Sequence, residues 1–365
     1  MKGNGYEAIK ELIRPNIAAL VPYSCARNDF AGTAEVYLDA NENWRDFVGD
    51  AGRNRYPDPL STKVRKSVER ALGLPASSLV IGNGSDEIID LLMRIFCIPG
   101  KDSVLLMPPT YGAYRVFADI NDVGTVSCPL TEDFQIDFPA LERTLAQERL
   151  SRRAEGGRCK LLFVCSPNNP TGNAFPVDQI RRVCDLFDGV TVVDEAYFDF
   201  SPYPSAATLL DRYPRLVVLR TLSKSWALAN ARVGIAVACE AIVRTMIDTK
   251  YPYNLGGPSQ DLAVQALSKV DEVKAAARRI VEARIALARR LEDLPVTLRV
   301  FSSDANFLLV KVRDPDGLCL WLRERGIIIR NRSRELHCEG CVRITVGSEA
   351  ENERLVEALE RYGRR

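Results

Sequence analysis

The sequence predicts an α/β protein, with a mainly parallel sheet in a large unit and a smaller α+β unit beside it. Two observations lead to this fold class. Short apolar runs alternate with helical patterns between residues 78 and 238. After residue 258, two helical patterns come first, and a second region of alternating strands and helices follows. Apolar runs without polar alternation indicate strands buried on both faces, as in parallel sheets whose strands are joined by helices. A length of 365 residues also favours two domains over one core.

The first unit is expected to hold seven short apolar strands. They are predicted at 78–81, 103–106, 123–128, 160–164, 190–193, 216–219 and 234–238. Helices are predicted at 61–72, 111–120, 137–147 and 176–187, with another that opens at 82–87 and ends near 96. The charged, glycine-containing stretch at 151–157 is expected to be a solvated surface excursion.

The second unit follows two predicted helices, at 259–270 and 272–291. Strands are predicted beyond them at 298–300, 306–310, 327–329 and 342–346, with helices at 316–325 and 349–362. The N-terminal segment carries a predicted helix at 6–13 and a short strand that begins at 36. We therefore expect a large domain over 46–262 and a small domain composed of 1–45 and 263–365.

Composition excludes several classes of protein. Lys and Arg total 49 against 48 Asp and Glu, so a formal charge of +1 gives no case for a nucleic-acid or membrane partner. The N-terminus lacks the apolar core of a secretory signal, and ten scattered cysteines fit reduced thiols in a cytoplasmic enzyme. Cys338 and Cys341 form a C-x-x-C without a second pair, and His337 is the single histidine, so we expect no metal site.

Two motifs follow predicted strands and are suited to binding a ligand. The sequence G-N-G-S-D-E at 82–87 lies where a strand ends and a helix begins, and such a turn presents free backbone N–H groups to a phosphate. Ser85 or Asp86 could instead simply cap the helix. The turn lacks the G-x-G-x-x-G spacing of a dinucleotide site. The second motif, S-P-N-N-P-T-G at 166–172, predicts a rigid loop at the carboxyl edge of the sheet.

Charged and aromatic residues near the ends of the strands are the candidate chemical groups. Asp194 ends an apolar strand and would need a cation or a protonated nitrogen beside it, although it could also be a solvated cap. Lys224, between two serines just after a buried strand, is either a surface lysine or a lysine that forms a Schiff base with an aldehyde cofactor. Arg232, eight residues later, could hold phosphate, and Tyr111 could stack on a flat cofactor or simply pack.

The order of these motifs resembles that of the fold-type I pyridoxal-phosphate aminotransferases, over nearly the whole chain. The motifs are G-N-G-S-D-E, P-T-Y-G, S-P-N-N-P-T-G, V-V-D-E-A-Y, T-L-S-K and R-V-G, in this order. Within that family the chain is most similar to the histidinol-phosphate aminotransferases. That similarity rests on L-D-A-N-E-N at 38–43, R-Y-P-D-P at 55–59, P-Y-N-L at 252–255 and V-R-I-T-V-G at 342–347.

The resemblance implies pyridoxal 5′-phosphate as cofactor and a role for each matching residue. Lys224 would form the Schiff base and shuttle the proton, and Asp194 would pair with the pyridine nitrogen. Asn169 and Tyr197 would bind the ring oxygen, with Tyr111 stacked on the ring. Ser85, Asp86, Ser223 and Arg232 would hold the phosphate.

The resemblance also implies how substrates bind. Arg343 would hold an α-carboxylate and Arg330 the distal anion, and Asn254 would face the cofactor and substrate. Tyr56 would reach in from the second subunit of a homodimer.

The implied reaction is transamination of L-histidinol phosphate with 2-oxoglutarate, in histidine biosynthesis. Three alternatives stay open: an aromatic amino-acid aminotransferase, a threonine-phosphate decarboxylase, and a catalytically silent ligand-binding relative. Two departures from the family pattern fall near the substrate. Trp44 stands where proline usually follows N-E-N, and the segment 331–341 adds Arg332 and Arg334, which are either solvated or part of the phosphate pocket.

Overall fold

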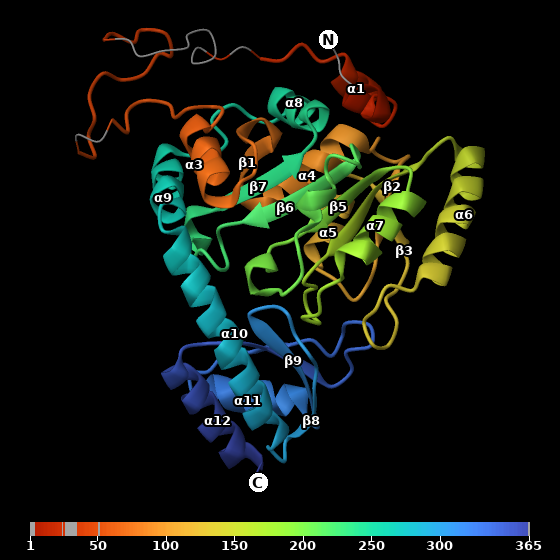
Figure 1. Cartoon of the computed structure of the whole chain (residues 1–365), viewed down its shortest axis with the longest axis vertical. Coiled ribbons are helices and arrows are strands. Elements are labelled where there is room, and N and C mark those ends of the chain that lie inside the picture. Colours follow the sequence, from red (N-terminus) through yellow and green to blue (C-terminus); the bar gives the residue numbers. More distant parts are fainter. Residues whose placement is uncertain (1–3, 24, 26–34, 50–51, 364–365) are drawn as a thin grey trace.

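A computed structural model describes residues 4–23, 25, 35–49 and 52–363 (Figure 1). Its large unit is built on a seven-stranded sheet with the order β1-β7-β6-β5-β4-β2-β3. The strands β2 to β6 pair in parallel, whereas β7 is antiparallel to both of its neighbours. The strands are β1 (Leu79–Asn83), β2 (Ser103–Leu106), β3 (Gly124–Ser127), β4 (Cys159–Cys165), β5 (Val190–Asp194), β6 (Leu216–Thr221) and β7 (Val233–Ala238). The prediction of a mainly parallel sheet is confirmed.

Helices cover both faces of this sheet because its strands are apolar on both sides. Along β6, Leu216 and Val218 belong to one core cluster, whereas Val217 and Leu219 belong to the other. The helices of the first cluster are α3 (Thr62–Leu72), α6 (Phe138–Glu155), α7 (Val177–Leu186) and α9 (Gly257–Leu267). Those of the second are α1 (Asn4–Ile9), α4 (Gly84–Phe96), α5 (Ala113–Ile120) and α8 (Glu240–Thr249).

The small unit contains a four-stranded antiparallel sheet with the order β10-β11-β9-β8. Its strands are β8 (Thr297–Val300), β9 (Phe307–Val312), β10 (Arg330–Asn331) and β11 (Cys341–Thr345). The long helix α10 (Val270–Glu292) runs from the large unit down to this sheet (Figure 1), where it packs with α12 (Glu349–Gly363) and near α11 (Pro315–Glu324). A separate apolar cluster around Leu287, Val310 and Ile344 forms its core.

The N-terminal segment packs on the large unit, whereas the prediction grouped residues 1–45 with the small one. Ile9 and Leu12 are fully buried in the core cluster of α4 and α8. Lys160 Nζ donates to the Leu12 carbonyl at 2.9 Å, and Arg14 N donates to Ile95 O at 2.9 Å. The described part of the segment also contains the short helix α2 (Pro15–Ala18), while 1–3, 24 and 26–34 lie outside the described residues. The predicted domain boundaries themselves stay a prediction.

Three local predictions differ from the structure. Helix α6 continues to Glu155, where a surface excursion was expected, because the added residues include good helix formers such as alanine, arginine and glutamate. Residues 36–39 form no strand, and β10 begins at Arg330 rather than within 327–329 because Arg330 pairs with Arg343 of β11. Short 3₁₀ turns complete the fold at η2 (Ala76–Ser78), η3 (Phe198–Phe200), η4 (Ala206–Leu209) and η5 (Ala229–Ala231). Among the described residues, no helix is both long enough and apolar enough to cross a membrane.

The carboxyl ends of the central parallel strands meet at one edge of the large sheet. Cys165, the last residue of β4, lies opposite Asp194, the last residue of β5, and Asp194 lies opposite Leu219 of β6. Loops that leave this edge therefore bring the S-P-N-N-P-T-G, D-E-A-Y and T-L-S-K motifs together. Ligands of open parallel sheets bind at such edges.

Candidate active site

A cavity of about 240 Å³ lies at this edge, between the large sheet and the small one. Both units contribute to its lining, and it gathers eleven of the thirteen predicted site residues. Its lining residues are Ser85, Asp86, Tyr111, Cys165, Asn169, Asp194, Ala196, Tyr197, Thr221, Ser223, Lys224, Arg232, Arg330, Arg332 and Arg343.

Asp194 is a buried carboxylate that is held by neutral groups. Its side chain accepts hydrogen bonds from Tyr114 Oη at 2.7 Å and from the Ala196 N–H at 3.1 Å. Burial raises the pKa of Asp194 above its ordinary value, because its charge is removed from water. A protonated ring nitrogen placed against this carboxylate would offset that cost.

Lys224 follows β6 in a loop whose backbone is tied to the sheet. The N–H of Leu222 donates to Val233 O at 3.0 Å, and Thr221 Oγ1 accepts from the Ser223 N–H at 3.1 Å. Burial lowers the pKa of Lys224, and the nearby positive charge of Arg343 lowers it further. A lowered pKa favours the neutral amine, which is the form that attacks an aldehyde.

A cradle suited to a phosphate lies where α4 begins, between Gly84, Gly234 and Arg232. Gly84 has a positive φ of 81°, and a Cβ at this position would lie 2.6 Å from Arg232 Nη2. A Cβ at Gly234 of β7 would lie 2.3 Å from the carbonyl carbon of Gly84, so the strand and the helix N-terminus can approach this closely only with glycine. Arg232 donates to Asp86 Oδ2 at 3.1 Å, which places a guanidinium beside the free N–H groups of the helix.

Two tyrosines line the cavity with their rings held by other side chains. Tyr111 Oη donates to Asp86 Oδ1 at 3.2 Å, and its ring meets Tyr114 edge-on at 5.4 Å. Burial, reinforced by Asp86, raises the pKa of Tyr111 to about 12, so it stays a phenol at neutral pH. The Tyr197 ring packs edge-on against Phe307 of β9 at 5.1 Å. The rings are thus fixed before any ligand arrives.

Arginines of the small sheet complete the cavity. Arg330 of β10 lies directly opposite Arg343 of β11, and Arg343 donates from Nη1 to Asn169 Oδ1 across the two units. Burial lowers the pKa of Arg343, and the positive charge of Arg332 adds to this effect. Such clustered guanidinium groups are suited to anionic substrates.

Tyr56 and Asn254 do not line the cavity within the single chain. Tyr56 is 52% exposed and stacks on Tyr253 at 4.5 Å, beside a different hollow. Asn254 lies behind the phosphate cradle, where its amide donates to Ile81 O at 3.1 Å and to Glu87 Oε2 at 2.8 Å. In the single chain the Asn254 amide holds the turn before α4, and its contact with the cofactor and substrate stays a prediction.

Sequence reasoning missed several residues that support the site. Tyr114, which binds Asp194, lies one helical turn after Tyr111, and this spacing could have indicated it. Cys165 and Thr221 line the cavity because they end β4 and β6 beside Asp194. The sequence allows Arg332 to be either solvated or part of the phosphate pocket, and the structure places it in the lining of the cavity.

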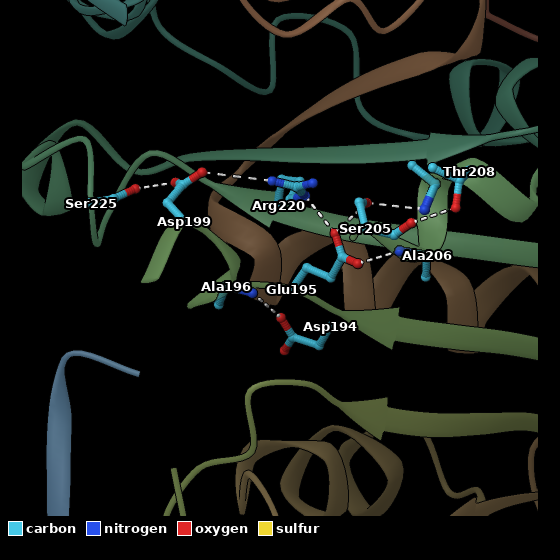
Figure 2. Close-up of polar contacts among 10 residues, drawn as sticks. Asp194, Glu195, Ala196, Asp199, Ser205, Ala206, Thr208, Arg220 and Ser225 are labelled. Carbon is cyan, nitrogen blue, oxygen red and sulfur yellow. Dashed lines mark hydrogen bonds and ion pairs between the residues drawn. The ribbon is translucent and has the colours of Figure 1, made fainter. Parts of the chain in front are cut away.

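A second carboxylate, Glu195, anchors a polar network behind the site (Figure 2). It forms a 2.7 Å ion pair with Arg220 Nε and accepts hydrogen bonds from Ser205 Oγ and the Ala206 N–H, both at 2.7 Å. Arg220 Nη1 lies 3.8 Å from Asp199 Oδ1, and Asp199 Oδ2 accepts a hydrogen bond from Ser225 Oγ. The network therefore joins the end of β5 to the loop that carries Lys224.

Together these groups fit the three polar parts of pyridoxal phosphate. The amine of Lys224 suits its aldehyde, the buried carboxylate of Asp194 suits its ring nitrogen, and the Gly84–Arg232 cradle suits its phosphate. Arg330, Arg332 and Arg343 of the small unit line the same cavity.

Comparison with known proteins agrees with this chemistry. The family model described as aminotransferase class I and II matches residues 6–359. The histidinol-phosphate aminotransferase of Cytophaga hutchinsonii is 43% identical over 355 residues, which cover 97% of this chain and 99% of that protein.

Two solved structures show the same fold. The histidinol-phosphate aminotransferase from Clostridium acetobutylicum gives a TM-score of 0.75 at 23% identity, covering 86% of this chain and 92% of that one. The enzyme of that name from Sinorhizobium meliloti, in complex with pyridoxal-5′-phosphate, gives 0.74 at 24% identity, covering 86% and 84%.

The predictions of a fold-type I architecture, an aminotransferase activity and a pyridoxal-phosphate cofactor are confirmed, which leaves the catalytically silent alternative without support. The chain therefore belongs to the class I and II aminotransferase family.

Proposed function

We propose that this enzyme transfers the amino group of L-histidinol phosphate to 2-oxoglutarate, as a step of histidine biosynthesis. The observation that carries the proposal is the pairing of Arg330 with Arg343 at the mouth of the cavity that contains Lys224. Arg330 can take the phosphate of one substrate and the distal carboxylate of the other, while Arg343 takes the α-carboxylate of 2-oxoglutarate. The similarity to relatives named histidinol-phosphate aminotransferase supports the same substrate.

The proposal gives a role to each lining residue that is predicted to bind the cofactor. Lys224 binds the cofactor aldehyde, and Asp194 pairs with its ring nitrogen. Asn169 and Tyr197 bind the ring oxygen, while Tyr111 stacks on the ring. The phosphate is held by backbone N–H groups of Ser85 and Asp86, by the Ser223 hydroxyl and by Arg232. Bound pyridoxal phosphate supplies the electron sink that stabilises negative charge on the substrate Cα.

Proton transfer falls to Lys224. With pyridoxal phosphate bound, the Nζ of Lys224 would accept the proton of the substrate Cα and would return it to the cofactor carbon that carried the aldehyde. Burial and the charge of Arg343 lower the pKa of Lys224, so the free amine is a competent base closer to neutral pH.

We also propose a homodimer in which Tyr56 contributes to the partner's site. Apolar side chains in the same segment are solvent-exposed, with Leu38 at 92%, Trp44 at 81% and Phe47 at 75%. Several strongly exposed apolar side chains in one short segment are typical of an interaction surface. We further propose a cytoplasmic location, which the ten scattered cysteines of the sequence support because they fit reduced thiols.

The experiment that tests the substrate compares kcat/KM for L-histidinol phosphate, phenylalanine and threonine phosphate. We expect histidinol phosphate to be preferred, and Arg330→Ala to reduce its kcat/KM more than that of phenylalanine. A preference for phenylalanine would favour the aromatic aminotransferase. Release of carbon dioxide from threonine phosphate would favour the decarboxylase.

A further inference from the structure

Arg332 lines the active-site cavity without a strong partner for its charge. Its side chain is 22% exposed, and its buried Nε atom has no hydrogen-bond partner among the residues that the structure describes. The nearest carboxylate, Glu335 Oε1, lies 3.5 Å from Nη1 and is itself 35% exposed. The backbone N–H of Arg332 donates to Cys341 O at 2.8 Å, which extends the β10–β11 pairing and fixes the residue beside Arg330.

The charges that line the cavity do not balance. Its cations are Lys224, Arg232, Arg330, Arg332 and Arg343, whereas its carboxylates are Asp86 and Asp194. Both carboxylates belong to the large unit, where Asp86 binds Arg232 and Asp194 accepts from Tyr114. None of the lining carboxylates neutralises the arginines of the small sheet. The pKa of Arg343 is lowered mainly by burial, and the positive charges of Arg332 and Arg330 lower it further.

A phosphate dianion matches this excess better than a single carboxylate does. It carries a charge of about −1.5 to −2 and three acceptor oxygens, so it can accept from two guanidinium groups at once. A carboxylate carries a single charge and is satisfied by one bidentate arginine. The backbone anchor at Cys341 holds Arg332 in place beside Arg330, so the pair is arranged before the ligand binds.

We propose that Arg332 is a specificity-determining residue that binds the distal group of the substrate together with Arg330. It selects a phosphate dianion over singly charged or uncharged groups. The inference rests on the proposed function for the identity of the phosphorylated amine. It assigns to the segment 331–341 a part in choosing the substrate.

Arg334 supplies a matched control. It lies two residues further along the same segment, is exposed, and is not among the residues that line the cavity. Loss of its charge changes the net charge of the segment by the same amount as loss of Arg332. If the two variants differ in kcat/KM, the cause is therefore the position of Arg332 in the cavity and not the loss of one positive charge.

The test uses the holoenzyme and two amines that differ only in the phosphate, L-histidinol phosphate and L-histidinol. We expect Arg332→Ala to lower kcat/KM for histidinol phosphate by about 10- to 100-fold, since a hydrogen bond to a charged group contributes about 1.5–3 kcal/mol. The loss with histidinol should stay within about twofold, and Arg334→Ala should change neither value by more than that. Arg332→Lys should recover part of the loss, because charge returns without the bidentate geometry.

Equal losses on both amines, or no loss on histidinol phosphate, would overturn the proposal. An unchanged thermal midpoint of Arg332→Ala checks that the variant is folded. If the wild type does not prefer histidinol phosphate to histidinol, the proposed function fails. Arg332 is then judged by inhibition with inorganic phosphate, measured on whichever amine the wild type turns over best. Weaker inhibition in Arg332→Ala than in Arg334→Ala would support anion binding, and equal inhibition would overturn it.

Discussion

The carboxyl edge of the large sheet and the β10–β11 hairpin of the small sheet form the two sides of one cavity, but they are built differently. At the large edge, Asp194 and Glu195 are buried at 3% and 4% exposure; Asp194 ends the central strand β5, and Glu195 follows it directly. On the hairpin, β10 is a two-residue edge strand whose residues are exposed. Groups that must keep one geometry lie at the end of the buried strand β5, and groups that bind different substrates lie on the exposed β10–β11 hairpin.

The two sides also differ in how their charges are satisfied. The carboxylates of the large edge have partners inside the protein, such as Tyr114 for Asp194 and Arg220 for Glu195. Arg330 and Arg343 face one another on adjacent strands, and Arg332 adds a third positive charge. A region with satisfied charges keeps its shape without ligand, whereas a region of like charges gains most when an anion binds.

The largest expected effect is on the large edge, at Lys224. Removal of its amine in Lys224→Ala should lower kcat for transamination by at least about 10³-fold, because proton transfer alone contributes about 10²–10⁴-fold. Single-turnover kinetics with histidinol phosphate would measure this loss. Retention of more than a tenth of the wild-type rate would show that another base carries the proton.

Arg220→Ala tests whether the network behind the large edge is needed for its rigidity. It should lower the free energy of unfolding by about 3–5 kcal/mol, because the buried Glu195 would keep its hydrogen bonds from Ser205 and Ala206 but lose the opposite charge beside it. Urea denaturation measures the effect. As a control, Arg290→Ala removes an exposed ion pair with Glu353 and should cost at most about 1 kcal/mol. Equal losses in the two variants would contradict the contrast between buried and exposed pairs.

Arg343→Ala tests the hairpin side, where activity should suffer more than stability. The half-reaction with 2-oxoglutarate should slow by about 10- to 100-fold in kcat/KM, since a charged hydrogen bond to the α-carboxylate is lost. The midpoint of urea unfolding should change little, because burial of the guanidinium already disfavours its charge. Absorbance changes of the cofactor would follow the half-reaction. Wild-type affinity for 2-oxoglutarate would refute this role of Arg343.

The smallest expected effect is a gain in stability from Asp194→Asn in the cofactor-free protein. Burial raises the folded-state pKa of Asp194, so the folded state loses stability as pH rises through that pKa. Asparagine carries no charge, and the variant should be about 0.5–2 kcal/mol more stable at pH 8, with the gain disappearing below about pH 4. Thermal unfolding across this range measures it. A constant difference at all pH values would exclude titration of Asp194 as the cause.

Much of the fold was predictable because it follows from local patterns. The seven apolar runs became the seven strands, with ends shifted by a residue or two, since strands buried on both faces need apolar residues at every position. The direction of β7 was not predictable in this way. An apolar run reads the same in either direction, and only its pairing with β1 and β6 decides that it is antiparallel.

The candidate site was predictable to the extent that its residues end strands or open helices. Lys224, Asp194 and Asn169 were brought together by the sheet edge, as their motifs indicated. The hydrogen bonds of the Asn254 amide were not predictable, because its partners Ile81 and Glu87 lie more than 160 residues away along the chain. Arg220 gave no signal, since a charged residue near the end of an apolar strand has no visible partner until Glu195 is placed beside it.

By itself, the sequence determined the chemistry of this protein: a lysine, a carboxylate and a glycine turn in a fixed order, each tied to the end of an element that forms from local hydrophobic pattern. The tertiary structure alone decided which charges balance. It placed Arg332 in the cavity, seated the N-terminal segment on the large unit and closed the Glu195 network. Pairing between distant side chains depends on their burial and on their separation in space. Neither quantity can be obtained from the spacing of residues along the chain.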